Sequence, residues 1–427
     1  MTSGARPRLT VVGLGADGWD GLPERLREVV RSAPVVLGGR RHLDLLPPVA
    51  GQVREPWPSP LRDGLPALLA RHTYAVALAS GDPLVSGIGT TLVALLGPDA
   101  VRVEPAVSSV ALARARLGWA AESVEAVTLV GRDPHLLLRA LAPGRRLLVL
   151  SSDEHTPAAV CALLVDQGYA ATRVVVLGDL GGPEESRREG TAGDWSGTAP
   201  RLHVLALEVA GPGGAGASWA AGLPDAAYEH DGQLTKRDLR AAALARLAPR
   251  PGQLLWDVGA GAGSVGIEWA RAHPTCRTVA VESHPGRAAR VARNAAALGV
   301  PGLAVVEGRA PDALAGLEAP DAVFVGGGAT RPGVLEACLE ALRPGGRLVV
   351  HGVTLETETL LTTAYAAHGG ELTRHHVETA EPIGSFTGWT PARAVVQWAY
   401  QAPETATAAP TTAPDPTPTA TPPQETP

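Results

Sequence analysis

The chain has 427 residues, of which 45% are hydrophobic and 19% are charged, and its formal net charge is −6. This length favours two domains over one, and the acidic balance argues against a nucleic-acid-binding protein, which is usually basic. No apolar run approaches the roughly 20 residues that cross a bilayer, and the apolar segment at the N-terminus is too short for a signal peptide.

The first half of the chain alternates short apolar strands with helical segments, a pattern that predicts α/β layering. Glycine-rich loops follow two of these strands: 9–13 runs into Gly13-Leu14-Gly15, and 74–79 runs into Ser80-Gly81-Asp82-Pro83. We predict further strands over 34–39, 101–105, 124–130, 145–151, 173–177 and 203–209, and helices over 22–32, up to 96, 108–117, 134–141 and 156–168. We interpret 181–198 as a polar loop.

Both glycine loops are open to more than one interpretation. The pattern G-x-G-x-x-G that starts at Gly13 fits a dinucleotide site formally. However, Gly38-Gly39-Arg40-Arg41 stands where an acidic partner for a ribose hydroxyl would close the next strand. An NADP site could use Arg40 or Arg41 on a phosphate. The Gly-Asp-Pro sequence suits a simple turn as well as a ligand-lining loop.

A run of Gly-Pro-Gly-Gly-Ala-Gly at 211–216 cannot hold a packed element. We therefore predict a first domain over 1–210, a linker over 211–224 and a second domain over 225–402. Residues 403–427 are rich in Pro, Thr and Ala, which predicts a disordered tail.

The second domain is organised around 254–269, LLWDVGAGAGSVGIEW. An apolar strand ends at Asp257 and Val258, then Gly259, Gly261 and Gly263 alternate before a helix begins. Such a corner binds an anion or a nucleotide, and glycine permits both the tight turn and the close approach of a ligand. Taken alone, the pattern fits a nicotinamide dinucleotide and S-adenosylmethionine equally.

Later segments favour the methyl donor. The strand over 278–281 ends in Glu282, about 20 residues after the glycine turn, where a carboxylate accepts ribose hydroxyls. Strands over 304–307 and 321–325 lead into an expected adenine loop, Gly308-Arg309-Ala310-Pro311, and into Gly326-Gly327-Gly328, where the transferred methyl would point. A strand over 347–351, a helix ending at 368 and strands over 371–378 and 392–400 predict the antiparallel finish of a class I methyltransferase. Before the turn, Thr235 fits a helix N-cap, with Asp238 completing a capping box.

Metal and disulfide chemistry are not expected. Cys161, Cys276 and Cys338 have no spacing typical of a zinc site or a disulfide framework, so we expect a reducing, cytoplasmic location. His375 and His376 are neighbours in a predicted strand and would face opposite ways. Trp256 and Trp269 are predicted to lie in the core.

The stretches VVGLGADG, SGDPLVSGIGTTL, PAVSSVALARARLG and LGGPEESRREGT resemble the tetrapyrrole methylase family, over most of 9–209. The resemblance implies two α/β lobes with S-adenosylmethionine in the cleft between them. It implies that the cofactor is lined by Gly13, Gly15, Gly81, Asp82 and Pro83. The chain departs from the family at Val130, where a His is usual, and at Ala16-Asp17, where Pro-Gly is common.

GQLTK, WDVGAGAGSVGIE, VEGRAP and DAVFVGGG resemble the decarboxylating precorrin C-methyltransferase family, over about 222–400. The resemblance implies a Rossmann-like class I fold whose cofactor is lined by Thr235, Asp257, Gly259, Ala260, Gly261, Ala262, Gly263, Glu282, Gly308 and Ala310. Arg309 replaces a frequent Asp and cannot accept a hydrogen bond from an adenine amine, so we expect it to face solvent or to leave that contact to the main chain. Candidates for substrate binding are His230, Lys236, Arg240, Gly326, Gly327 and Gly328, although the first three also suit a solvated helix end.

The two domains in this order resemble the fused methyltransferases of aerobic cobalamin synthesis. The first half would then methylate carbon 5 of precorrin-6B, and the second would methylate carbon 15 and decarboxylate the ring C acetate, giving precorrin-8X. Such a substrate needs cations for its carboxylates but no metal or nucleophilic triad. We also expect a homo-oligomer that uses no nucleic acid or membrane. Alternatives are a two-domain NAD(P) oxidoreductase, a non-catalytic tetrapyrrole carrier and an enzyme specific for cobalt-precorrin.

Overall fold

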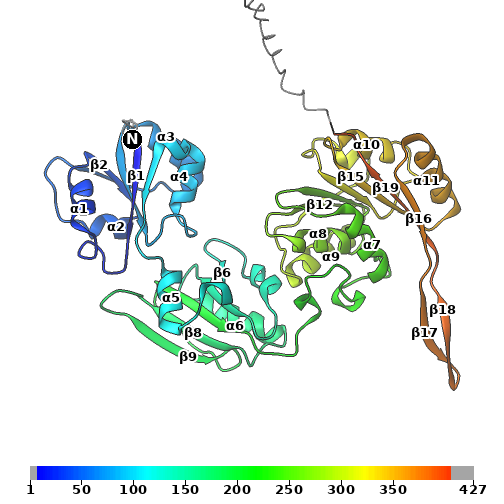
Figure 1. The fold of residues 1–427 in the computed structure, drawn as a ribbon, viewed down its shortest axis with the longest axis horizontal. Helices are drawn as coiled ribbons and strands as arrows, with labels where there is room; N and C mark the ends of the chain where they lie inside the picture. Colours follow the sequence, from blue (N-terminus) through cyan, green and yellow to red (C-terminus); the bar gives the residue numbers. More distant parts are fainter. Residues whose placement is uncertain (1–6, 405–427) are drawn as a thin grey trace, which may run out of the picture. The chain divides into compact units, whose positions relative to one another are not determined.

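The computed structural model describes residues 7–404. These divide between two compact units (Figure 1): unit 1 comprises Met1–Ala227 with Arg293–Gly302, and unit 2 comprises Tyr228–Ala292 with Leu303–Pro427. The tail predicted over 403–427 falls outside the described residues from 405 onward.

The first lobe of unit 1 is a five-stranded parallel sheet in the order β3-β2-β4-β1-β5. The inner strand β1, between β4 and β5, is buried along its whole length, as expected for a parallel strand covered on both faces. The elements of this lobe are β1 (Leu9–Leu14), α1 (Glu24–Arg31), β2 (Val35–Gly38), α2 (Arg40–Asp44), β3 (Val53–Pro56), α3 (Leu61–Ala70), β4 (Ala75–Ser80), α4 (Ile88–Leu96), the 3₁₀ turn η1 (Pro98–Ala100) and β5 (Val101–Glu104).

The second lobe is a mixed five-stranded sheet in the order β6-β7-β10-β8-β9. Together the two sheets confirm the predicted two-lobed α/β architecture. The elements are α5 (Ser109–Leu117), η2 (Ala121–Ser123), β6 (Glu125–Thr128), η3 (Pro134–Ala140), β7 (Arg146–Leu150), α6 (Thr156–Asp166), β8 (Arg173–Gly178), β9 (Ser186–Thr191) and β10 (His203–Glu208), followed by the short turns η4 (Ala215–Ala217) and η5 (Asp225–Ala227).

The prediction of a loop over 181–198 is wrong, because β9 lies within it. This strand pairs only with β8, at the edge of the sheet, and its first four residues are exposed. An edge strand of this kind carries polar side chains on both faces and therefore lacks the apolar pattern of a core strand. In addition, the segment 134–141 forms a 3₁₀ helix, and α2, β3 and α3 were not anticipated.

Unit 2 contains a seven-stranded sheet in the order β13-β12-β11-β14-β15-β19-β16, in which β19 runs antiparallel to both neighbours. This confirms the class I methyltransferase fold and its antiparallel finish. The elements are α7 (Arg237–Leu247), β11 (Leu254–Val258), α8 (Ser264–Ala272), β12 (Arg277–Glu282), α9 (Pro285–Ala297), β13 (Ala304–Glu307), η6 (Asp312–Leu314), β14 (Ala322–Val325), α10 (Val334–Ala341), β15 (Arg347–Gly352), α11 (Leu355–His368), β16 (Glu371–His375) and β19 (Val395–Gln401).

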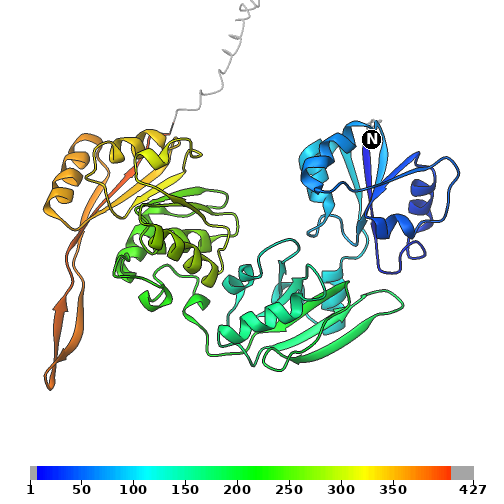
Figure 2. The same ribbon diagram turned by 180° about the vertical axis from the view of Figure 1, so that it is seen from behind.

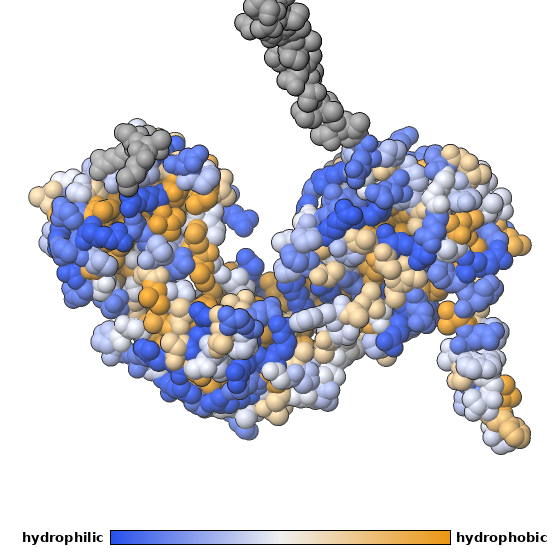
Figure 3. Space-filling view, viewed as in Figure 1, coloured by the Kyte–Doolittle hydropathy of each residue, from blue (hydrophilic) through white to orange (hydrophobic). Residues whose placement is uncertain are grey.

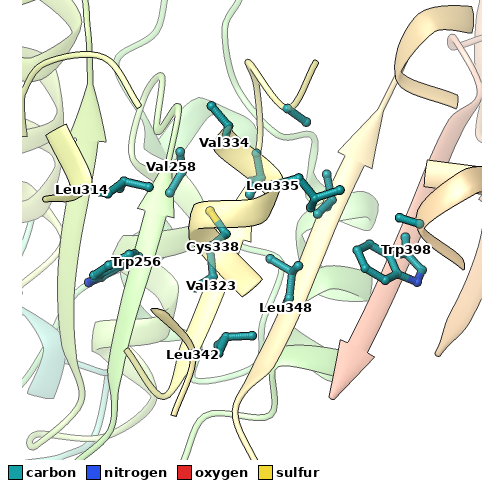
Figure 4. Close-up of a cluster of buried hydrophobic side chains, with 14 of the residues drawn as sticks. Trp256, Val258, Leu314, Val323, Val334, Leu335, Cys338, Leu342, Leu348 and Trp398 are labelled. Atoms are coloured by element: carbon teal, nitrogen blue, oxygen red, sulfur yellow. The ribbon is translucent and has the colours of Figure 1, made fainter. Parts of the chain in front are cut away.

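The core of unit 2 fixes the strand ends that carry the candidate site. Trp256 and Val258 of β11 pack with Cys338 of α10, Leu348 of β15 and Trp398 of β19 (Figure 4). Trp256 and Trp269 are 2% and 0% exposed, which confirms their prediction as core residues. Burying a large side chain in this way stabilises the fold by roughly 1.5–3 kcal/mol.

A hairpin of β17 (Glu378–Ile383) and β18 (Phe386–Pro391) leaves unit 2 as a separate two-stranded sheet, which projects from the larger sheet in both views (Figures 1 and 2). The sequence did not lead us to predict it, because its residues are almost all exposed and do not follow the alternating pattern of a strand that packs on the core.

Within the described residues, no helix combines the length and apolar character that a membrane span requires. Cys161, Cys276 and Cys338 are all buried.

Candidate active sites

The candidate site of unit 1 is a cavity of about 470 Å³ at the carboxyl ends of β1 and β4. These strands are parallel neighbours in which Leu14 pairs with Ser80, so the loops that follow them meet at one edge of the sheet. Gly15, Gly81 and Asp82 line the cavity, as the sequence predicted for cofactor-binding residues. Arg41 and His42 of the first lobe line it as well, and the second lobe adds residues such as Asp179 and His203.

Gly13 and Pro83, which were predicted with them, are not among the residues that line the cavity. A Cβ on Gly13 would lie 2.0 Å from the carbonyl oxygen of Gly81, and one on Gly87 would lie 2.6 Å from the carbonyl oxygen of Pro83. Two segments of the backbone therefore pass so closely at Gly13 and Gly87 that only glycine fits there. Asp82 accepts a hydrogen bond from the Leu84 N–H at 2.9 Å, which fixes the loop.

The cavity also holds a group of charged and polar side chains that the sequence did not single out as substrate ligands: Arg41, His42, Ser80, Asp179, Arg201 and His203. His42 is 9% exposed, and burial, followed by the charge of Arg41, lowers its pKa to about 4. Burial likewise lowers the pKa of His203. Both rings are therefore neutral at pH 7.

In unit 2, the glycine turn after β11 is shaped by the packing of the protein itself. Gly259, Gly261 and Gly263 have φ of 67°, 59° and 77°. A Cβ at these positions would lie 2.7 Å from the Gly327 oxygen, 2.8 Å from the Gln233 oxygen and 2.7 Å from Val291 Cγ1, respectively. Any other residue would combine left-handed backbone strain with a collision.

The backbone N–H groups of this turn already donate hydrogen bonds to oxygen atoms of the protein. Those of Gly259 and Ala260 donate to the Val281 oxygen at 2.9 and 3.2 Å, Gly261 to Glu282 Oε2 at 2.8 Å, Ala262 to the Gln233 oxygen at 3.2 Å and Gly263 to the Ala260 oxygen at 2.8 Å. A pyrophosphate needs such donors free. The turn therefore fits a nucleoside ligand without phosphate better than a dinucleotide.

Asp257 occupies the position that a phosphate would take at the N-terminus of α8. Its Oδ2 accepts a hydrogen bond from the Gly266 N–H at 2.9 Å, and the side chain is 1% exposed. Its pKa is raised to about 7. Burial is the largest cause, the hydrogen bond from the Gly266 N–H opposes the rise, and the charge of Glu282 adds to it. Asp257 thus anchors the helix and does not face a ligand directly.

Glu282 is 5% exposed and ends β12 beside the turn. Its Oε2 accepts from Gly261 N–H at 2.8 Å and its Oε1 from His284 N–H at 2.9 Å. Each carboxylate oxygen has a second lone pair, so both can still accept a ribose hydroxyl. The residue therefore joins the glycine turn to the candidate ribose site.

The remaining predicted residues divide by accessibility. Ala262 is buried with Gly261 and Gly263. Exposed or half-buried at the carboxyl edge are Thr235, Gly259, Ala260, Gly308, Ala310, Gly326, Gly327 and Gly328. His230, Lys236 and Arg309 are exposed as well. The N-cap prediction for Thr235 is wrong, since Lys236 holds that position without a side-chain cap.

Arg240 must be corrected as a substrate ligand, because it is 0% exposed. Its Nε lies 2.5 Å from Glu268 Oε1, and its guanidinium lies 4.8 Å from the ring centroid of Tyr228. The Tyr228 hydroxyl donates to the same Glu268 oxygen at 2.8 Å. This buried group ties α7 to α8 and leaves Arg240 unable to contact a substrate carboxylate.

Comparison with known proteins places both units in families. Residues 8–195 match the tetrapyrrole (corrin/porphyrin) methylases, and 226–402 match the precorrin methyltransferase domain. A precorrin-6Y C(5,15)-methyltransferase [decarboxylating] of Sinorhizobium sp is 46% identical over 397 residues, which cover 92% of this chain and 96% of that protein. The protein of the same name from Mycobacterium tuberculosis is 45% identical over 394 residues, with 91% and 98% covered.

A solved structure, the C-terminal domain of precorrin-6Y C5,15-methyltransferase from Rhodobacter capsulatus, is 45% identical, covers 43% of this chain and 99% of that chain, and has a TM-score of 0.41. With similarity to full-length relatives along almost its whole length, this chain belongs to the family of the decarboxylating precorrin-6Y C(5,15)-methyltransferases.

Proposed function

We propose that the chain uses S-adenosylmethionine to methylate precorrin-6B at ring carbons 5 and 15 and decarboxylates the ring C acetate, giving precorrin-8X for cobalamin biosynthesis. The observation that carries this proposal is the 46% identity to a decarboxylating precorrin-6Y C(5,15)-methyltransferase over 92% of the chain. Unit 1 would serve carbon 5, and unit 2 carbon 15 and the decarboxylation.

The residues of unit 2 fit the methyl donor. Glu282 would hold the ribose, Gly308 and Ala310 the adenine, and the exposed backbone of Gly259 and Ala260 the amino-acid end. In unit 1, Gly15, Gly81 and Asp82 line a cavity that suits a nucleoside. The bound donor supplies an electrophilic methyl group, so the protein has to orient an electron-rich ring carbon, and such positioning is worth several kcal/mol.

The decarboxylation needs no metal or nucleophile of the protein in this proposal. Loss of carbon dioxide leaves an electron pair on the former acetate carbon, and the conjugated macrocycle can delocalise it, as a cofactor does. The exposed Gly326 to Gly328 segment at the end of β14 would allow the flat ring to approach the backbone closely.

The test is an incubation of the full chain with precorrin-6B and S-adenosylmethionine carrying a ¹³C methyl group. We expect two labelled methyl carbons in the NMR spectrum of the product and one equivalent of carbon dioxide. A product without label would refute the proposal. Calorimetry with S-adenosylhomocysteine and with NADH separates it from the oxidoreductase alternative, and the cobalt complex of the same substrate tests a preference for metallated rings.

We further propose that the chain forms a homo-oligomer through the β17–β18 hairpin. Two-stranded ribbons are marginal in isolation, and Ile383, Phe386 and Trp389 of this ribbon are 61%, 79% and 69% exposed. Figure 3 shows apolar surface at its tip. A second copy of the chain would cover these side chains.

Light scattering should give a mass above that of one chain, and a Phe386→Ser, Trp389→Ser double variant should shift the protein toward monomer. A matched control is Leu355→Ser, which removes an apolar side chain that is 79% exposed on α11. A monomeric wild type, or an unchanged mass in the double variant, would contradict the hairpin interface.

A further inference from the structure

Two arginines in the cavity of unit 1 have no carboxylate partner. Arg41 follows β2 in the first lobe, and Arg201 precedes β10 in the second. Within residues 7–404, neither takes part in an ion pair, whereas Arg102, Arg116 and Arg173 of the same unit pair with glutamates. Arginine is the side chain best suited to bind a carboxylate through two parallel hydrogen bonds.

Neutral groups hold Arg41 in place. Its Nη2 lies 2.8 Å from His42 Nε2 and 3.1 Å from Ser80 Oγ. Because a guanidinium can only donate, His42 Nε2 must accept and the proton of the neutral ring must sit on Nδ1. The pair positions the guanidinium without neutralising its charge.

The charges that act on Arg41 favour an anion beside it. Partial burial lowers the pKa of Arg41, the charge of Asp179 opposes this effect and the charge of Arg201 adds to it. The two guanidinium groups are therefore close enough to repel each other, and an anion between them would remove the repulsion. Asp82 and Asp179 both line the cavity, and of these two carboxylates only Asp179 acts on the pKa of Arg41.

Backbone strain is concentrated at the same cavity. Among the described residues, three positions other than glycine have positive φ, and two of them, Ser86 at 53° and Asp179 at 46°, line this wall. Such strain costs roughly 1–3 kcal/mol at each position and persists where the surrounding structure imposes it, most often at ligand sites.

We propose that Arg41 and Arg201 form a carboxylate-binding site in the cavity of unit 1, with His42 as a positioning residue, occupied by an acetate or propionate side chain of the tetrapyrrole. The assignment of the tetrapyrrole rests on the proposed function. The amino-acid end of the methyl donor carries the same chemical group, so the experiment has to distinguish the two sources.

The experiment compares Arg41→Gln, Arg201→Gln and the double variant with Arg62→Gln, which alters an exposed arginine of α3 outside the cavity. Carbon 5 methylation is measured as a function of tetrapyrrole concentration, and carbon 15 methylation by the same chains serves as an internal control. Calorimetry with S-adenosylhomocysteine reports on the donor. Fluorescence titration with uroporphyrin, a polycarboxylate tetrapyrrole, reports binding without turnover.

We expect each single variant to raise KM for carbon 5 methylation and Kd for uroporphyrin about tenfold, which corresponds to about 1.4 kcal/mol. The double variant should lose less than the sum of the two effects, because both residues bind one group. A His42→Phe variant should raise KM while leaving kcat nearly unchanged, and it should add nothing to Arg41→Gln.

A loss of S-adenosylhomocysteine affinity with unchanged uroporphyrin binding would retain the carboxylate site and assign it to the donor. Among the described residues, the Arg201 side chain makes no hydrogen bond or ion pair, so Arg201→Gln removes no contact within the protein. If this variant matches Arg62→Gln in every assay, the site is refuted. Absence of carbon 5 methylation by the wild type would refute the proposed function alone, since the uroporphyrin titration still tests the site.

Discussion

Replacing Asp257 with Asn tests whether the N-terminus of α8 is held by a carboxyl group that resists ionisation. The side chain is 1% exposed, and its Oδ2 accepts a hydrogen bond from the Gly266 N–H at 2.9 Å. Asparagine has the same shape, can keep an oxygen toward Gly266 and places an uncharged NH₂ group near Glu282. The substitution therefore removes the ionisation and little else.

The direction of the pH effect follows from the raised pKa of Asp257, about 7 in the folded chain against an ordinary value of 3.8. Below pH 3.8 the carboxyl group is protonated in both states and the effect is absent. Between pH 3.8 and 7 the folded chain keeps a proton that the unfolded chain has lost, so stability falls as pH rises. Above pH 7 the cost reaches roughly 4 kcal/mol, at 1.36 kcal/mol per pKa unit, as an upper value because the α8 dipole favours the anion.

The assay is denaturant unfolding of the full chain at pH 5 and pH 8, followed by hydrogen exchange of the β11–α8 segment. The wild type should lose up to about 2.7 kcal/mol more than Asp257→Asn between these conditions, because about two of the three pKa units of the shift lie above pH 5. Asp238→Asn, which alters an exposed carboxylate on α7, should follow the wild type. Equal pH dependence in the wild type and Asp257→Asn would refute the assignment of a buried carboxyl group that resists ionisation.

Three further predictions follow from single contacts. Glu282→Ala should reduce carbon 15 methylation about a hundredfold, because it removes charge-assisted hydrogen bonds worth roughly 3 kcal/mol, and should spare carbon 5 methylation by the same chain; an equal loss of both would contradict separate donor sites. Arg240→Met should lower the unfolding free energy of unit 2 by roughly 3–5 kcal/mol, since it leaves the buried Glu268 carboxylate without the guanidinium that compensates its charge; a raised KM without loss of stability would restore Arg240 as a substrate ligand. Gly13→Ala should destabilise unit 1 by about 3 kcal/mol, measured by thermal unfolding, because the new Cβ would lie 2.0 Å from the Gly81 oxygen; a stable, fully active variant would contradict this.

The fold could be predicted where strands are buried on both faces. β1, β4 and β11 are nearly continuous apolar runs because helices cover parallel sheets on both sides. The edge strand β9 and the β17–β18 hairpin were missed because exposed strands carry no apolar signature. Register and edge position are properties of the sheet that no local pattern encodes.

The same limit applies to the sites. The resemblance to the tetrapyrrole methylases assigned Gly15, Gly81 and Asp82 to the cofactor site, and all three line the cavity in loops that follow buried strands. Arg41 and Arg201 are 160 positions apart, and only folding brings them to one cavity. Arg240 was misjudged because a basic residue near a helix start is usually solvated, and its burial depends on Glu268 on another helix.

Two copies of the G-x-G-x-x-G pattern, starting at Gly13 and Gly261, were candidate nucleotide sites, and the structure uses neither as a phosphate cradle. Gly13 lets β1 pass against the Gly81 loop. At the second copy, the N–H groups from Gly259 to Gly263 bond to the protein, and Asp257 places a carboxyl oxygen at the N-terminus of α8, where it accepts the Gly266 N–H. Because this carboxyl group already fills that place, a pyrophosphate would have to displace it. The spacing of the glycines therefore indicates only that backbone segments pack tightly. The hydrogen bonds of the turn's N–H groups are what distinguish a site for a dinucleotide from a site for a nucleoside without phosphate.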